Sequence, residues 1–324
     1  MTDISIIEAA LAEVADGRFS AVKFDDGRVS LVLNVSGLDV RDRGQIEIAV
    51  KGRLLELDDV TKVDIVMTAE KIERRLIAVG SGKGGVGKST LSTNLAIAMR
   101  AMGRKVGMVD ADIYGPSQPR LLNCEGQRPE AEGKQLIPVP NEYDIPALSM
   151  GHLAKPGQAI AWRGPMAGKA LEQLINAHWG DVEELIVDMP PGTGDVQLSM
   201  MQNHKPVGAV IVSTPQDLAL MDAVRAVDLF EQAKIPIIGM VENMAGYACP
   251  HCGEISDPFG AGGAEAAAKT MSMAFLGRVP LDMEIRKASD GGIPPAAVDG
   301  GQGQAFHDIA KRLVTWLDNQ KAGA

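Results

Sequence analysis

The sequence predicts an α/β protein with a mostly parallel sheet and helices on both of its faces, preceded by a small α+β domain. From Leu76 onward, short apolar runs alternate with helix-like stretches, which is the pattern of strands joined by crossover helices. A glycine-rich turn, Gly-Ser-Gly-Lys-Gly-Gly-Val-Gly-Lys-Ser-Thr, follows the first apolar run at positions 80–90. Because parallel strands end at one edge of such a sheet, we expect ligands to bind at that edge.

The composition fits one large domain together with a small one. At 324 residues the chain exceeds a typical domain, and 45% hydrophobic residues can form a sizeable core. The formal net charge is −10 and no basic run occurs, which argues against a nucleic-acid partner. Residues 1–14 lack the basic and apolar regions of a signal peptide, and apolar runs such as 207–212 are too short to cross a membrane. We therefore expect a cytoplasmic protein without a membrane partner.

Residues 1–70 are predicted to form the small α+β domain. Apolar residues recur at helical spacing over 4–14, whereas 28–35 and 45–50 have near-alternating apolar positions that suit half-buried strands. A polar stretch at 71–75 is the predicted linker to the second domain, residues 76–324.

The elements of the second domain follow in order. Residues 76–79 predict a buried strand, and the helix after the glycine-rich turn stops at Gly103. The apolar face of the last predicted helix, 304–317, is expected to pack on the core, because its polar face is not basic enough for a membrane anchor. The remaining pattern predicts a helix at 216–233 and strands at 106–109, 184–187, 209–212, 237–241 and 275–276.

The glycine-rich turn fills the P-loop pattern G-x-x-x-x-G-K-[ST], in which backbone N–H groups hold phosphate oxygens, a lysine reaches the β/γ-phosphates and a hydroxyl meets Mg²⁺. Gly80, Gly82 and Gly85 also satisfy the dinucleotide pattern G-x-G-x-x-G, with Asp110 as its ribose-binding acid. A dinucleotide turn has no need of the lysine and hydroxyl that follow, so a nucleoside triphosphate is favoured. The predicted nucleotide-binding residues are Gly82, Lys83, Gly84, Gly85, Val86, Gly87, Lys88, Ser89 and Thr90.

Acidic residues end two predicted strands. Asp188 follows an apolar strand and precedes a stiff Pro-Pro turn, which suits an acid that holds Mg²⁺ through water opposite Ser89. Asp110 and Asp112 end another strand, where they either orient water or touch the metal shell, or cap the turn at 115–116. Met189 occupies the position where many P-loop ATPases place a glutamate base.

Two further polar residues have open roles. Lys83 lies inside the turn, where it is either a solvated loop lysine or a cation that reaches a partner's phosphates across a dimer interface. Asn243 follows the strand predicted at 237–241, where its amide could contact a nucleotide base or serve as a turn residue.

The sequence Cys-Pro-His-Cys at 249–252 is the second candidate centre. Cys249 and Cys252 supply two thiolates, whereas a closed metal or cluster site needs four ligands, and Cys124 is interpreted as structural. A two-fold dimer would bring two such pairs together. The alternatives are a bridging iron–sulfur cluster, a shared zinc, or a redox-active or inert dithiol.

Taken together, five ordered motifs closely resemble the Mrp/ApbC family of iron–sulfur cluster carrier ATPases, over Leu76 to the C-terminus. The wider class includes nitrogenase iron protein and the MinD/ParA positioning ATPases, and it has a deviant Walker A motif with an extra lysine, here Lys83. The motifs are the P-loop at 82–90, Asp-Ala-Asp-Ile-Tyr-Gly-Pro-Ser at 110–117, Trp-Arg-Gly-Pro-Met at 162–166, Asp-Met-Pro-Pro-Gly-Thr-Gly-Asp at 188–195 and Cys-Pro-His-Cys at 249–252.

The resemblance implies a homodimeric ATPase that carries a labile [4Fe–4S] cluster, held by Cys249 and Cys252 of both subunits. Lys83 would reach across the dimer, Asp112 would lie near the attacking water, and Asp188 would belong to the Mg²⁺ shell; Lys83, Lys88 and Asp112 are thus the predicted catalytic residues. ATP would gate cluster loading from an assembly scaffold or release to apo-proteins. The small N-terminal domain has no cysteine and lacks the family's Asp-Pro-Glu, so no metal is expected there. The alternative function is a positioning ATPase acting on a membrane or DNA.

Overall fold

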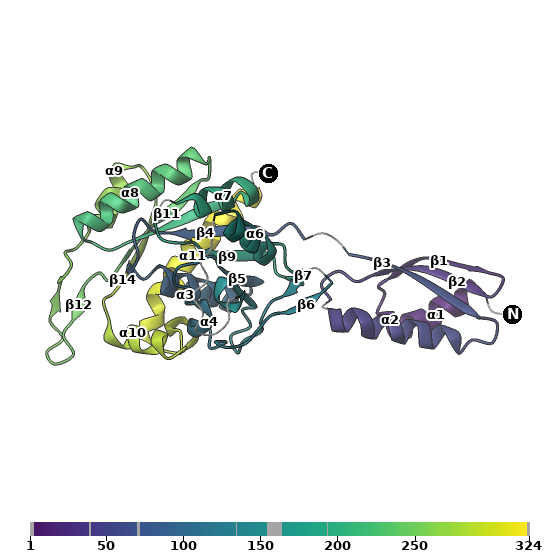
Figure 1. Ribbon diagram of the computed structural model, residues 1–324. Coiled ribbons are helices and arrows are strands. Elements are labelled where there is room, and N and C mark those ends of the chain that lie inside the picture. The colour runs from purple at the N-terminus through teal and green to yellow at the C-terminus, as the bar shows by residue number, and fades with distance from the viewer. Residues whose placement is uncertain are drawn as a thin grey trace. The chain divides into compact units, whose positions relative to one another are not determined.

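The computed structural model describes residues 3–38, 40–69, 72–133, 135–153, 164–192 and 194–322. The chain divides into two compact units, residues 1–73 and 74–324 (Figure 1). Lys71 of the predicted linker, and Trp162, Arg163 and Thr193 of the sequence motifs, lie outside the described residues.

The first unit is a three-stranded sheet covered by two helices. Strands β1 (Phe19–Asp25) and β2 (Arg28–Asn34) form an antiparallel hairpin, and β3 (Lys62–Thr68) is parallel to β2. The inward residues of β2 pack with helices α1 (Ile4–Ala15) and α2 (Val40–Leu55) in one apolar core. The helix predicted over 4–14 and the strand predicted over 28–35 therefore both occur.

The strand predicted at 45–50 is wrong, because these residues lie within α2. Ile46, Ile48 and Val50 alternate with polar residues in the sequence, which suggested a strand. On the helix, Val50 and Leu54 are buried and Ile46 packs beside them, whereas Ile48 is 73% exposed. The helical stripe at positions 46, 50 and 54 thus determines the fold of this segment.

The second unit is built on a seven-stranded parallel sheet with the order β14-β11-β10-β4-β9-β5-β8. Its strands are apolar because both faces are covered, as is typical of parallel sheets. Six were predicted; β8 was not, because it has only three residues and follows a proline. The strands are β4 (Arg75–Gly80), β5 (Val106–Asp110), β8 (Ala147–Ser149), β9 (Glu184–Asp188), β10 (Gly208–Ser213), β11 (Ile237–Asn243) and β14 (Phe275–Val279).

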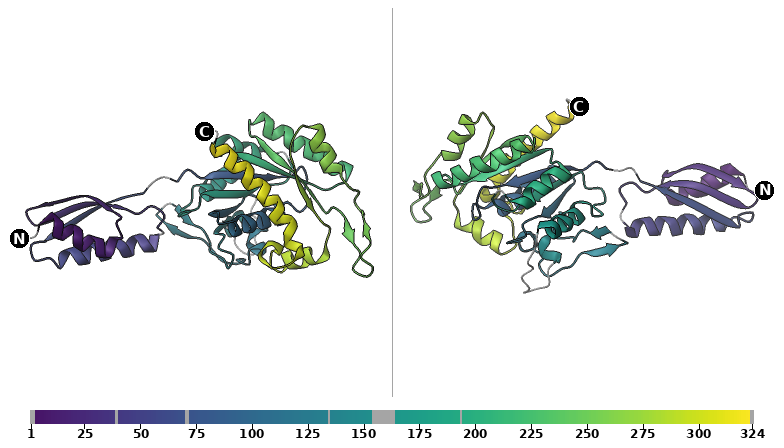
Figure 2. Two further views of the ribbon diagram at one scale, coloured as in Figure 1. Left: turned by 180° about the vertical axis from the view of Figure 1, so that it is seen from behind. Right: turned by 45° about the horizontal axis from the view of Figure 1, so that its top comes forward.

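Helices cover both faces of this sheet, as predicted (Figure 2). Ile77 and Val79 of β4 pack in a core with α3 (Lys88–Ala101) and α11 (Gly301–Ala322), whereas Ala78 packs on the opposite face with α6 (Gly164–Ile175) and α8 (Asp217–Gln232). The other helices are α4 (Gln118–Leu121), α5 (Met150–Leu153), α7 (Asp195–His204), α9 (Gly263–Thr270), α10 (Met283–Asp290) and the 3-10 turn η1 (Pro295–Ala297).

The apolar face of α11 belongs to the core, as predicted, with Phe306, Ile309 and Leu313 buried. Within the described ranges, no helix combines the length and apolarity needed to cross a bilayer.

Two short hairpins extend from the second unit, and neither was predicted. β6 (Glu130–Glu132) pairs with β7 (Gln135–Ile137), and β12 (Tyr247–Ala248) pairs with β13 (Ile255–Ser256) (Figure 1). The β12–β13 hairpin follows β11 directly and carries the Cys-Pro-His-Cys sequence at its tip.

Candidate functional site

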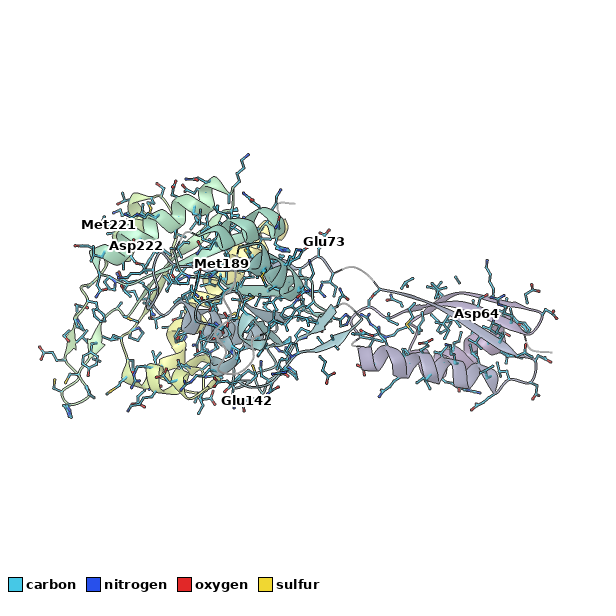
Figure 3. The ribbon with its side chains drawn as sticks, in the orientation of Figure 1. Asp64, Glu73, Glu142, Met189, Met221 and Asp222 are labelled. Carbon is cyan, nitrogen blue, oxygen red and sulfur yellow. The ribbon has the colours of Figure 1, made fainter. Side chains whose placement is uncertain are left out.

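The P-loop joins the carboxyl end of β4 to the first turn of α3. Gly85 and Gly87 both have φ +80, a left-handed conformation that favours glycine. A Cβ on Gly82 would clash with the main chain of Asp222, which lies on α8 beside Met221 (Figure 3). The glycines thus let the backbone turn tightly at the N-terminus of α3, where free N–H groups and the helix dipole favour a phosphate.

Lys88 lies among the predicted metal-binding groups. Its Nζ is 2.5 Å from Asp188 Oδ1, 3.3 Å from Ser89 Oγ and 4.0 Å from Asp112 Oδ2. Lys88 is 6% exposed and Asp188 is fully buried. The structure therefore brings four predicted residues together, and their hydroxyl and carboxylate oxygens are the hard donors that Mg²⁺ prefers.

Asp110 and Asp112 have different surroundings. Asp112 Oδ1 accepts hydrogen bonds from the Tyr114 and Gly115 N–H groups, so this carboxylate caps the turn while its other oxygen faces Lys88. Asp110 is fully buried and accepts from the Ser149 hydroxyl at 2.9 Å. Burial, and then the nearby Asp188 carboxylate, raise the pKa of Asp110 to about 7.

Gln118 was missed by the sequence interpretation, although it connects the site's parts. Its Nε2 donates to Asp188 Oδ2 and to the Ser89 carbonyl, both at 3.0 Å, and its Oε1 accepts from Thr93 Oγ1 at 2.6 Å. Ser92 Oγ donates to Asp188 Oδ1 at 3.0 Å. Ser92 could have been found from the sequence, because it lies four residues after Lys88, on the same face of a helix. For Gln118, the only signal in the sequence is its position directly after the 110–117 motif.

Lys83 lies in the phosphate loop, and Asn243 contacts this loop from the end of β11. Lys83 is half-buried, and no described residue forms a hydrogen bond or ion pair with its ammonium group. Asn243 Nδ2 donates to the Val86 carbonyl at 2.8 Å, so its amide supports the loop backbone. Contact of Asn243 with a nucleotide base stays a prediction.

The cysteine pair lies on the β12–β13 hairpin. The Cys249 N–H donates to the Glu254 carbonyl and the Gly253 N–H donates to the Cys249 carbonyl, which closes a tight tip. Backbone hydrogen bonds from His251 and Cys252, and then the Cys252 thiol, hold the pKa of Cys249 below its ordinary value. Cys252 is exposed and Cys249 is half-buried.

Cys124 belongs to the core, consistent with a structural role. It is 1% exposed, its Sγ is 4.0 Å from His152 Nε2, and burial raises the pKa of its thiol to about 11. Among the residues that the structure describes, no three His, Cys, Asp or Glu side chains form a metal-binding group. The hairpin of one chain therefore offers two thiolates.

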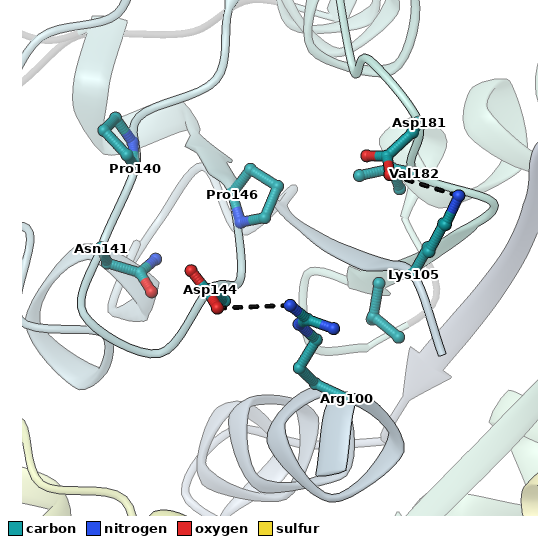
Figure 4. Close-up of a pocket in the computed structure, with 9 residues that line it drawn as sticks. Arg100, Lys105, Pro140, Asn141, Asp144, Pro146, Asp181 and Val182 are labelled. Atoms are coloured by element: carbon teal, nitrogen blue, oxygen red, sulfur yellow. Dashed lines mark hydrogen bonds and ion pairs between the residues drawn. The ribbon is translucent and has the colours of Figure 1, made fainter. Parts of the chain in front are cut away.

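A cavity of about 300 Å³ lies at the opposite end of β5 from Asp110 (Figure 4). Its lining includes Arg100, paired with Asp144 at 3.2 Å, and Lys105, paired with Asp181 at 3.3 Å. It contains none of the predicted site residues, and both of these cations have acidic partners.

Comparison with known proteins identifies relatives over most of the second unit. Residues 72–314 match the ParA family model described as NUBPL iron-transfer P-loop NTPase. The iron-sulfur cluster carrier protein of Methanocaldococcus jannaschii is 42% identical over 254 residues, which cover 78% of this chain and 87% of that protein. The Arabidopsis thaliana iron-sulfur protein required for NADH dehydrogenase is 46% identical, over 75% of this chain and 78% of that protein.

Solved structures give the same fold. An Archaeoglobus fulgidus nucleotide-binding protein, in complex with ADP, is 39% identical with a TM-score of 0.62, over 72% of this chain and 91% of that one. The cell division ATPase MinD of Pyrococcus furiosus is 23% identical with a TM-score of 0.56, over 74% and 98% of the two chains. The likeness to MinD concerns the fold alone.

Proposed function

Because this chain belongs to the NUBPL iron-transfer P-loop NTPase family, we propose that it binds and hydrolyses ATP and carries a labile [4Fe–4S] cluster between two copies of itself. The cluster is cargo, received from an assembly scaffold and delivered to apo-proteins of the cytoplasm. The supporting observation is that the phosphate loop and the cysteine hairpin share one edge of the sheet. Asn243 at the end of β11 contacts Val86 of the loop, and the hairpin follows directly.

Lys88 and the carboxylates around it perform the nucleotide steps of this proposal. Lys88 exchanges its Asp188 partner for the β- and γ-phosphates of ATP, which the N–H groups of the loop hold. Ser89 and Asp188 would hold Mg²⁺, which supplies charge neutralisation on the transferring phosphate. Asp112 then orients the attacking water, because one of its oxygens is fixed by the 114–115 turn and the other faces the site.

Lys83 has a separate role in the proposed dimer. Its ammonium has no partner among the described side chains, and the neighbouring Gly84 and Gly85 are exposed. We assign it to the phosphates of the partner subunit, where a cation stabilises the transition state as an arginine finger does.

The cluster would be bound by four thiolates, Cys249 and Cys252 from each of two chains. The lowered pKa of Cys249 favours the thiolate, which is the form that binds iron. Zinc can occupy the same four-thiolate geometry and is the expected substitute when iron is lost.

Anaerobic reconstitution with iron and sulfide tests this function. Wild-type protein should gain the absorbance of a [4Fe–4S] cluster with iron counted at one cluster for each pair of chains, and Cys124→Ala should behave identically as the matched control. The double variant Cys249→Ala, Cys252→Ala should bind none. Equal iron in the double variant and the wild type would overturn the proposal.

A further inference from the structure

The end of β11 contacts the phosphate loop through the side chain of Asn243. Asn243 Nδ2 donates to the Val86 carbonyl at 2.8 Å, and Asn243 is 9% exposed. A Cβ on Gly87 would clash with that amide nitrogen and lie 3.9 Å from Met244 Cε. The loop backbone and the end of β11 are therefore packed without space for a side chain between them.

The bonded carbonyl belongs to the peptide unit that joins Val86 to Gly87. Because a trans peptide is planar, its C=O and N–H point in opposite directions. Asn243 holds the Val86 carbonyl on the β11 side, so the Gly87 N–H points away from β11. A phosphate on the loop binds through N–H groups of this kind and so acts on the same peptide unit.

Residues close to Asn243 in sequence also anchor both ends of the cysteine hairpin. Just before β12, the Ala245 N–H donates to the Val279 carbonyl at 3.0 Å, and Gly246 accepts from Leu281 at 2.9 Å. After β13, the Gly262 and Ala264 N–H groups donate to the buried carboxylate of Glu242 at 3.2 and 2.8 Å. Both ends of the hairpin that carries the cysteines are thus held by residues within three positions of Asn243.

We propose that Asn243 is a positioning residue that couples occupancy of the phosphate loop to the accessibility and reactivity of Cys249 and Cys252. Phosphate fixes the 86–87 peptide, the peptide fixes Asn243, and the neighbouring Glu242 and Met244 set the hairpin's base. Met244 has φ +59, so this short segment is held in a strained conformation that a small rearrangement can relieve. This coupling rests on the proposed function in one respect only, namely that the two thiols bind an iron–sulfur cluster.

The test uses iron-free protein and measures thiol alkylation. Rates of iodoacetamide labelling at Cys249 and Cys252 are followed by peptide mass spectrometry, with and without Mg²⁺ and ADP or a non-hydrolysable ATP analogue. Nucleotide should change the wild-type rates by at least about fivefold, the lower bound of typical coupling between sites. In Asn243→Ala and the isosteric Asn243→Asp, which both lose the donor to Val86, the ratio should approach one.

Controls separate this coupling from weaker binding and from misfolding. Each variant is measured at nucleotide concentrations that saturate it, and Asn123→Ala, which removes an exposed amide bonded to Glu142, should keep the wild-type ratio. The proposal would be overturned if nucleotide left the wild-type alkylation rates unchanged. It would also be overturned if both Asn243 variants kept the wild-type ratio of rates with and without nucleotide.

A reciprocal measurement needs no variant. If the loop and the thiols are coupled, zinc bound at Cys249 and Cys252 should change ADP affinity in wild-type protein by the same factor as ADP changes zinc affinity, because equilibrium coupling between sites acts in both directions. Equal ADP affinity with and without zinc would also overturn the coupling. Failure to bind a cluster would instead refute the proposed function and leave these ratios unaffected.

Discussion

Replacing Lys88 by methionine should destabilise the second unit even without nucleotide. The Nζ to Oδ1 distance of 2.5 Å to Asp188 corresponds to an attraction of about 7 kcal/mol at an effective dielectric constant of about 20. Desolvation of both buried groups offsets much of this, and removing one partner of a buried pair costs about 3–5 kcal/mol. Asp188 keeps its hydrogen bonds from Ser92 and Gln118, so we expect a loss of about 3 kcal/mol.

Urea unfolding followed by tryptophan fluorescence measures this loss in the second unit alone, because all three tryptophans lie at 162, 179 and 316. Lys105→Met is the matched control: its pair with Asp181 is half exposed and should cost at most about 1 kcal/mol. Asp188→Asn should be milder than Lys88→Met, because Lys88 retains Asp112 at 4.0 Å. In the double variant, the two losses should fall short of additivity by at least about 1 kcal/mol. Equal midpoints for Lys88→Met and the wild type, or strict additivity, would refute the buried pair.

Three other outcomes are expected. Gly87→Ala should abolish ADP binding by calorimetry and cost about 1–3 kcal/mol in urea unfolding, because φ is +80 and the new Cβ would clash with Asn243; unchanged binding would contradict this. Burial lowers the pKa of His152 to about 4, so stability is full above pH 6.5 and should fall by up to about 3 kcal/mol as the pH drops to 4; unfolding curves of His152→Gln should lack this loss, and parallel pH profiles would exclude the assignment. Lys83→Ala should retain most ATP binding and lose hydrolysis, whereas Lys88→Ala should lose binding; two variants with wild-type turnover in a phosphate-release assay would rule out the composite site.

The site residues that could be predicted from the sequence are those that belong to a short, continuous motif. Lys88 and Ser89 follow the loop glycines in one turn, and Asp188 follows an apolar strand, so local pattern was sufficient. Buried parallel strands are apolar on both faces, which made β4 and β10 recognisable as continuous runs.

What was missed depends on contacts between distant residues. Gln118, which was not predicted, reaches Asp188 across 70 positions of sequence. Asn243 was predicted as a candidate residue, but its contact with Val86, 157 positions away, was not, because neither pairing has a local pattern. The segment 45–50 was predicted as a strand because its apolar residues alternate with polar ones. It is a helix, because Leu54, one turn after Val50, is buried on the same face.

Native mass spectrometry of anaerobically reconstituted protein decides whether the cluster bridges two chains. We expect a species of two chains with one [4Fe–4S] cluster, and we expect this species to be lost when Cys249 and Cys252 are replaced by alanine. A cluster bound to a single chain, or a cluster retained by two chains of the double variant, would contradict it.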